Sequence, residues 1–429
     1  MKIKKFIAVS TFAVLSSLNI SAQNGSNLPS FSRQPIITET HTKSLSRQTT
    51  EVSRERRAQA YAKLLEGQRY IWFINHNRSQ SAINSNIKLA RQALQKAVEL
   101  DPNLAEGYTA LAYLSRTPAG IEDSILLANI AAKIDRDNFG ARQLLAQLYT
   151  IKSGLNTDAF DAAMAEKAIA EWKEIARLDP RNAEAFAFLS EFYAKINKKT
   201  ERIAALKNWL SSSTPFSDGF YGRVFRDESL APQAATVKLG QALLENREVG
   251  EAVEILSRAV AEEPENTQAI KLLSAAIEMA DNASVTGAVQ ALQQAVFANP
   301  DNPSLVILLA QVQSRTGKIE DAAKTLRDSS EKLAVKDKVA SSDLQVALAD
   351  IYGGSNRIDE AAAVYQNALV TRGINKTEVV TNGERDFAVQ VFAKIINLYK
   401  KANRPNDAKA TIERARVFLG EKDLFRDKN

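Results

Sequence analysis

The feature that most constrains this chain is a short polar corner that returns at nearly regular intervals. Its five copies are AVELDPN at 97–103, AKIDRDN at 132–138, IARLDPRN at 175–182, VAEEPEN at 260–266 and VFANPDN at 296–302. The distance from Pro102 to Arg136 in the first two copies is 34 residues, and the distance from Pro264 to Pro300 in the last two is 36 residues. A fixed period of this size indicates an array in which each repeat is one small supersecondary motif.

The stretches between the corners predict helices. From about residue 56 the chain is rich in Ala, Leu, Glu, Lys and Arg, with apolar residues recurring at a period near 3.6 and no alternating strand pattern. Proline at a corner ends one helix and fixes the entry to the next. We therefore predict an all-α chain of about nine helix-turn-helix units, which begin near residues 60, 105, 139, 183, 233, 267, 303, 342 and 389.

The residues inside the units resemble the tetratricopeptide repeat (TPR) family. In the unit that begins at residue 233, the family's preferred positions hold Leu239, Gly240, Ala252, Leu256, Ala259 and Pro264. The small residues fall where the two helices of a unit cross, and the large residues fill the space beside the crossing. The resemblance implies that the units stack into an α-solenoid, a right-handed superhelix whose concave groove binds proteins or peptides without catalysis.

The N-terminal segment 1–22 predicts an export signal. A basic start, MKIKK, precedes an apolar run of 13 residues, FIAVSTFAVLSSL, and cleavage after Ala22 would leave Gln23 first. The alternative is a membrane anchor, but a spanning helix needs roughly 20 apolar residues. We expect a soluble periplasmic or extracellular protein without stable membrane insertion. The chain has no cysteine, which excludes disulfides, thiolate metal sites and a lipidated cysteine.

The domain organisation follows from these patterns. Residues 23–55 are rich in Ser, Thr, Asn and Gln and predict a disordered tether. We expect a first array at 56–215, a linker loop with aromatic and glycine residues at 216–232, a second array at 233–422 and a tail at 423–429. The whole chain carries a net charge of +6, and removal of 1–22 leaves 53 basic and 50 acidic side chains. This excess gives no reason to expect nucleic-acid binding.

The interruption of the array near 211–232 has two interpretations. Its apolar side chains are Phe216, Phe220, Tyr221 and Phe225. These aromatics either contact a partner or cover the exposed end of the first array, and we favour the covering role because a solenoid end needs protection. The preceding helix also departs from the repeat pattern, since Trp209 stands where a small residue is expected.

The sequence contains no pattern that indicates catalysis or a cofactor. It lacks a Gly-rich phosphate-binding motif, and its two histidines, His41 and His76, lie in the tether and in an insertion. The insertions at 71–86 and 153–163 lack a convergent nucleophile, base and orienting group. We therefore expect no enzyme activity, no metal site and no cofactor.

The resemblance to the TPR family implies that positions 5 and 9, counted from the first residue of each unit, face the groove, and these positions hold the candidate binding residues. Position 9 holds Gln68, Tyr113, Gln147, Glu191, Gln241, Gln311, Asp350 and Asn397, and position 5 adds Gln143 and Lys271. A row of primary amides offers donors and acceptors to the backbone of an extended peptide. The alternative is that glutamine merely forms helices well and suits any wet position.

These observations leave two functions open. The first is an exported scaffold or adaptor that binds a protein or extended peptide in the cell envelope. The second is a structural subunit or assembly factor of a pilus, secretion or outer-membrane complex that acts by self-association. The identity of the partner is not predicted by either.

Overall fold

The structure is a computed structural model that describes residues 52–214, 219–226, 228–374, 381–421 and 424–425. The signal and tether predicted for 1–55 lie outside these residues except for 52–55. The chain divides into two compact units, Met1–Pro232 and Gln233–Asn429, called unit 1 and unit 2 below. The described residues contain α-helices, one 3-10 helix and no strand, which confirms the all-α prediction.

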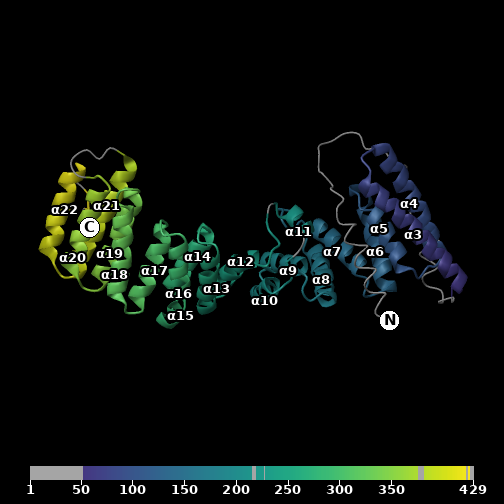
Figure 1. The fold of residues 1–429 in the computed structure, drawn as a ribbon, viewed down its shortest axis with the longest axis horizontal. Helices are drawn as coiled ribbons and strands as arrows, with labels where there is room; N and C mark the ends of the chain where they lie inside the picture. The colour runs from purple at the N-terminus through teal and green to yellow at the C-terminus, as the bar shows by residue number, and fades with distance from the viewer. Residues whose placement is uncertain (1–51, 215–218, 227, 375–380, 422–423, 426–429) are drawn as a thin grey trace. The chain divides into compact units, whose positions relative to one another are not determined.

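Unit 1 is a series of helices in which each helix up to residue 210 packs on the next (Figure 1). Its elements are α3 (Arg54–His76), α4 (Gln80–Leu100), α5 (Ala105–Leu114), η2 (Pro118–Gly120), α6 (Ile121–Ile134), α7 (Phe139–Ser153), α8 (Ala162–Leu178), α9 (Ala183–Lys195), α10 (Lys199–Leu210) and α11 (Gly219–Val224). They form four helix pairs, α3–α4 to α9–α10, followed by the short helix α11, which lies against α9.

Unit 2 continues the same arrangement. Its elements are α12 (Ala234–Glu245), α13 (Val249–Glu262), α14 (Thr267–Met279), α15 (Asn282–Thr286), α16 (Ala288–Ala298), α17 (Pro303–Arg315), α18 (Ile319–Leu333), α19 (Lys338–Gly354), α20 (Ile358–Thr371), α21 (Asn382–Lys401) and α22 (Pro405–Leu419). Four of its pairs are direct, whereas α14 and α16 are joined through α15, and both pack on α13.

Four of the five repeated corners cap the helix that follows them. At residues 179–182 the Asp179 carboxylate accepts from the Arg181 N–H at 3.2 Å, and the Asn182 side chain accepts from the Ala185 N–H at 2.9 Å. The second bond satisfies an N–H that has no partner inside the first turn of α9. Asparagine caps the first turn in the same way at Asn138, Asn266 and Asn302.

A second device closes the turn inside five of the helix pairs. Asn197, Gly317, Asn356 and Asn403 have positive φ angles between 55° and 82°, and Arg247 takes the same place with φ 64°. The residue after each donates its N–H to a carbonyl five residues earlier, at 2.8–2.9 Å. Such a turn favours glycine and asparagine, which tolerate the left-handed region. Its recurrence shows that the sequence period is a period of structure.

Small residues allow the helices of a pair to approach closely. A Cβ atom on Gly67 would lie 2.5 Å from Cγ of Leu94, and one on Gly240 would lie 2.4 Å from Cγ of Leu256. Real Cβ atoms do not occur at such distances, so glycine is required by the crossing itself. Leu94 and Leu256 fill the space that the missing side chains leave.

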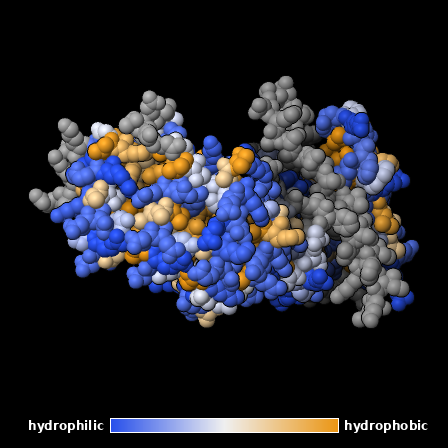
Figure 2. Space-filling model, turned by 60° about the vertical axis from the view of Figure 1, so that its left-hand side comes forward, coloured by the Kyte–Doolittle hydropathy of each residue, from blue (hydrophilic) through white to orange (hydrophobic). Residues whose placement is uncertain are grey.

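The surface is mostly hydrophilic, with small separate apolar areas on the face shown in Figure 2. Among the described residues, no helix is both long enough and apolar enough to cross a membrane. The same residues contain no group of three or more acidic or histidine side chains placed to hold a metal ion.

Candidate functional site

Helix α11 is held against α9 by an aromatic cluster. Phe188 of α9 stacks on Trp172 of α8, with ring centroids 4.6 Å apart. On its other side, Phe188 contacts Phe220 at 5.2 Å and Tyr221 at 5.3 Å, both from α11. Buried aromatic pairs of this kind add to the free energy gained from burying their area. The cluster therefore fixes α11 on unit 1.

Trp209 explains why α10 departs from the repeat pattern. Its ring is fully buried and lies 5.5 Å from the Tyr221 ring, and its Nε1 donates to the Leu230 carbonyl at 3.1 Å. The corresponding position is a buried alanine in other pairs, for example Ala259 and Ala368, where another helix packs closely. In unit 1 the segment with α11 occupies that place, and the larger indole fills the remaining space.

Polar contacts anchor both ends of α11. The Glu184 carboxylate accepts from the N–H groups of Phe220 at 2.8 Å and Tyr221 at 3.2 Å. At the other end, Nδ2 of Asn156 donates to the Val224 carbonyl at 2.6 Å. The free backbone groups of this short helix are thus satisfied by side chains of unit 1.

These contacts favour the covering role of the aromatic segment. Phe220 and Tyr221 are buried inside unit 1, where both pack on Phe188. Phe225 is partly buried and packs on Tyr221 at 4.8 Å, and Phe216 lies outside the described residues. The Tyr221 hydroxyl also contacts Glu191 at 3.1 Å, so that candidate groove residue has a structural role.

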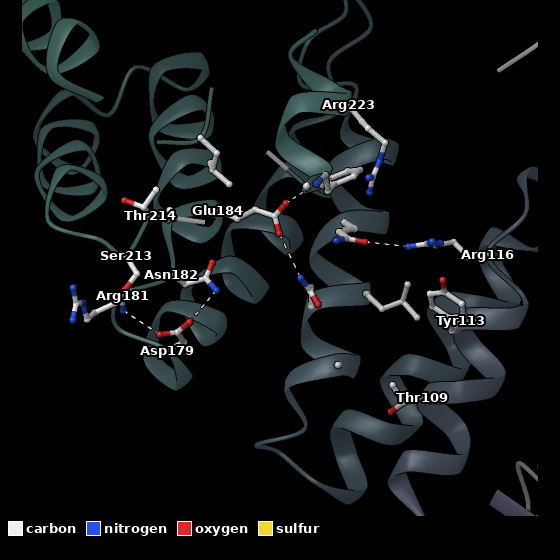
Figure 3. A pocket seen from close by; sticks show the side chains of 18 residues that line it. Thr109, Tyr113, Arg116, Asp179, Arg181, Asn182, Glu184, Ser213, Thr214 and Arg223 are labelled. Carbon is white, nitrogen blue, oxygen red and sulfur yellow. Dashed lines mark hydrogen bonds between the residues drawn. The ribbon is translucent and has the colours of Figure 1, made fainter. Parts of the chain in front are cut away.

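Helix α11 also forms one wall of a pocket of about 320 Å³ in unit 1 (Figure 3). The other walls come from α5, α7 and α9, the first helices of three consecutive pairs, and from residues after α8 and α10. The pocket is lined by Thr109, Tyr113, Arg116, Gly140, Gln143, Leu144, Gln147, Asp179, Arg181, Asn182, Ala183, Glu184, Ser213, Thr214, Gly219, Phe220, Arg223 and Leu230.

One end of the pocket is cationic. Figure 3 shows Arg116 and Arg223 at this end, beside Tyr113. The Arg116 guanidinium lies 4.8 Å from the centre of the Tyr113 ring, and its Nη1 donates to Oε1 of Gln147 at 3.3 Å. Burial lowers the pKa of Arg116; Tyr113 opposes this effect, and the positive charge of Arg223 adds to it. Neither arginine forms an ion pair with a carboxylate among the described residues.

Glu184 lies in the middle of the pocket. Besides the two N–H groups of α11, its carboxylate accepts from Nε2 of Gln143 at 3.4 Å. Burial raises the pKa of Glu184, while the hydrogen bonds from Phe220 and Tyr221 and the charge of Arg223 act in the opposite direction. This carboxylate is therefore occupied by donors of the protein itself.

The opposite end of the pocket contains one acidic and one basic residue, Asp179 and Arg181. Asp179 accepts from Nδ2 of Asn182 at 3.1 Å as well as from the Arg181 backbone, so its carboxylate is also occupied. Ser213 and Thr214 are exposed at this end, and the Ser213 N–H donates to the Arg181 carbonyl at 3.1 Å.

The structure brings three of the candidate groove residues together. Tyr113, Gln143 and Gln147 line the pocket, on α5 and α7. Gln68 is partly buried on α3 and does not line it. The sequence prediction missed Arg116 and Glu184, which occupy positions 12 and 2 of their repeats, and Arg223, which lies in the interruption.

The candidates of unit 2 do not belong to this pocket. Asp350 accepts from Nζ of Lys394 at 2.8 Å and from the Tyr365 hydroxyl, so its carboxylate is bound within the unit. Gln241 donates to Glu245 of its own helix at 2.8 Å. The remaining candidates, which are exposed side chains, are Lys271, Gln311 and Asn397.

Comparison with known proteins agrees with the repeat architecture. A sequence model of the tetratricopeptide repeat family matches residues 281–340, from α15 to the start of α19. The helix pairs before and after this region share the same turns and the same small residues at helix crossings. Residues 281–340 therefore match the tetratricopeptide repeat family, and the other helix pairs have the same architecture. Repeats of this family generally form non-catalytic scaffolds for protein binding. No curated protein matches the chain in sequence.

Several solved TPR structures are similar to parts of the chain. YrrB, a TPR protein with an unusual peptide-binding site, is 16% identical, covers 50% of this chain and 96% of its own, and has a TM-score of 0.33. A TPR protein from Parabacteroides merdae is 15% identical, with coverages of 68% and 99% and a TM-score of 0.33. The C-terminal part of a Cytophaga hutchinsonii TPR protein is 11% identical, with coverages of 67% and 97% and a TM-score of 0.35. Likeness at these values supports no statement about a shared ligand.

Proposed function

We propose that this TPR protein is a scaffold or adaptor that binds an extended segment of another protein in the pocket of unit 1. The observation that carries the proposal is the anchored helix α11. It lies over the first helices of consecutive pairs and leaves a pocket of about 320 Å³, within the size range of small-molecule and side-chain binding sites. A segment that merely covered an exposed end would not require polar side chains to converge on the space beneath it.

The glutamines of α7 are suited to a peptide backbone. Gln143 uses its Nε2 to donate to Glu184, and Gln147 uses its Oε1 to accept from Arg116. Gln143 therefore offers a carbonyl oxygen, and Gln147 offers an amide N–H. A peptide group needs one acceptor for its N–H and one donor for its C=O. The two side chains, one turn apart on one helix, provide that pair.

Photo-cross-linking tests the placement of the partner. We expect a full-length chain with benzoylphenylalanine at Gln143 to form covalent adducts with other proteins when illuminated in cells that express it. The matched control carries the same residue at Lys133, which is exposed on α6 and does not line the pocket. Adducts at Lys133 with none at Gln143 would place the partner elsewhere and refute binding in the pocket.

A second candidate function is self-association as a structural subunit. It is favoured by large apolar side chains exposed along α3: Leu65 is 64% exposed, Trp72 is 49% exposed and Tyr61 is 44% exposed. At the helical angle of 100° per residue these three lie on one face of α3. A self-associating chain would show a mass that rises with concentration in analytical ultracentrifugation and returns to that of one chain after Leu65→Ser and Trp72→Ser.

We also propose that the chain is exported to the cell envelope or beyond. The support is the sequence pattern of residues 1–22, which lie outside the described residues. We expect Edman sequencing of the protein from an exporting host to begin at Gln23, and a variant lacking 2–22 to stay in the cytoplasm. An N-terminus that still contains the apolar run would refute cleavage.

A further inference from the structure

We propose that the segment bound in the unit 1 pocket carries a carboxylate, which Arg116 and Arg223 bind together. This inference rests on the proposed function and adds the chemical class of the bound group. In a bound protein segment, a carboxylate belongs either to an aspartate or glutamate side chain or to the C-terminus.

The first support is the arrangement of the two arginines. They come from different elements, Arg116 from the end of α5 and Arg223 from α11, and both line the same end of the pocket. Arg116 is held in place on one side by the Tyr113 ring and on another by Gln147. A guanidinium presents parallel N–H donors that match the two oxygens of a carboxylate.

The second support is the missing counter-charge. The charge of the exposed Arg223 lies close enough to lower the pKa of Arg116, which is itself partly buried. A desolvated cation next to another cation is costly unless an anion compensates for it. Among the described residues Arg116 has no carboxylate partner, although ion pairs such as Arg142 with Glu171 at 2.9 Å form elsewhere in unit 1. An anionic ligand would provide the compensation.

The charge of the pocket favours a single negative charge. Arg116, Arg181 and Arg223 line it together with Asp179 and Glu184, which leaves an excess of one positive charge. The Glu184 carboxylate accepts from α11 and from Gln143, and the charge of Arg223 acts on it, so its negative charge is already counted in this balance. A singly charged carboxylate balances this excess, whereas a doubly charged phosphate would exceed it by one negative charge.

The apolar lining agrees with an acidic side chain rather than a free ion. Leu144 of α7 and Phe220 of α11 line the pocket beside the polar groups, and both can pack on the methylene groups of glutamate or on a neighbouring apolar residue. Arg223 reaches the site only because α11 is anchored on α9. The carboxylate site is therefore a product of the interruption and not of the repeat pattern.

Selection from peptide libraries on the full-length protein tests the inference. One library of 12-residue peptides is fused to its carrier through the C-terminus, so that only side-chain carboxylates are available, and a second presents free C-termini. We expect the wild type to enrich peptides with aspartate or glutamate in the first library, or with a specific free C-terminus in the second. Replacing the responsible carboxylate by its amide should weaken binding about tenfold in calorimetry.

Matched variants assign the effect to the pocket. Arg116→Gln and Arg223→Gln should each remove the preference for acidic peptides, whereas Arg226→Gln, an exposed arginine outside the pocket, should keep it. Circular dichroism establishes that each variant is folded. Tight peptides that contain no required carboxylate, or acidic peptides that bind both pocket variants like the wild type, would overturn the inference while peptide binding stands. Enrichment of no peptide at all would overturn the proposed function as well.

Discussion

Replacing Phe188 by alanine is expected to lower the free energy of unfolding of unit 1 by about 3–5 kcal/mol, the usual cost of removing a buried aromatic ring. Phe188 is fully buried and its ring contacts Trp172 on one side and Phe220 and Tyr221 on the other. Its removal leaves a cavity between α8, α9 and α11. We also expect α11 to detach, because the aromatic contacts that hold it on α9 pass through this ring.

Tryptophan fluorescence during urea unfolding measures this effect in unit 1 alone. The three tryptophans of the chain, Trp72, Trp172 and Trp209, all lie in unit 1. The matched control is Phe73→Ala, which removes a phenylalanine that is 39% exposed on α3 and should cost much less. Equal losses for both variants would show that the aromatic cluster does not stabilise unit 1.

The second large effect is expected from Gly240→Val in unit 2. A Cβ at residue 240 would lie 2.4 Å from Cγ and Cδ2 of Leu256, so α12 and α13 must move apart or Leu256 must leave its place. Overpacking of this kind costs about 1–3 kcal/mol. The expected result is a lower midpoint in urea unfolding followed by circular dichroism.

A second glycine provides the control for this variant. Gly354 ends α19 and has nothing within 4 Å of the position of its missing Cβ, so Gly354→Val should leave the midpoint nearly unchanged. If the two valine variants were equally stable, the close crossing of α12 and α13 would be incorrect.

The repeat fold could be predicted from the sequence because its causes are local. The polar corners that end in asparagine mark the end of one helix and the cap of the next, as at Asp179 and Asn182. Glycine and alanine at fixed positions of the repeat predict where the two helices of a pair cross. Helix α11 could not be predicted in the same way, since residues 216–232 have no helical period and contain two glycines and a proline. Its position is decided by contacts with Phe188 and Trp209, far away in sequence.

The pocket could be predicted only in part, because some of its residues are brought together by contacts between segments that are distant in sequence. Position 9 and position 5 of the repeats identified Tyr113, Gln147 and Gln143, and the same register could have pointed to Arg116 at position 12 and Glu184 at position 2. Arg223 has no repeat position, so only the fold shows that it faces Arg116. In unit 2, Gln241 donates to Glu245 and Asp350 accepts from Lys394, so these two candidates have partners within their own unit.

Hydrogen–deuterium exchange of the full-length chain, with and without a peptide selected from the libraries, tests the central claim most directly. Binding in the pocket should slow exchange in α5, α7, α9 and α11, the helices that line it. The same peptide should not alter exchange in α6, which contributes no lining residue. Slower exchange confined to unit 2, or to helices outside the pocket, would contradict the account, because the bound segment would then lie elsewhere.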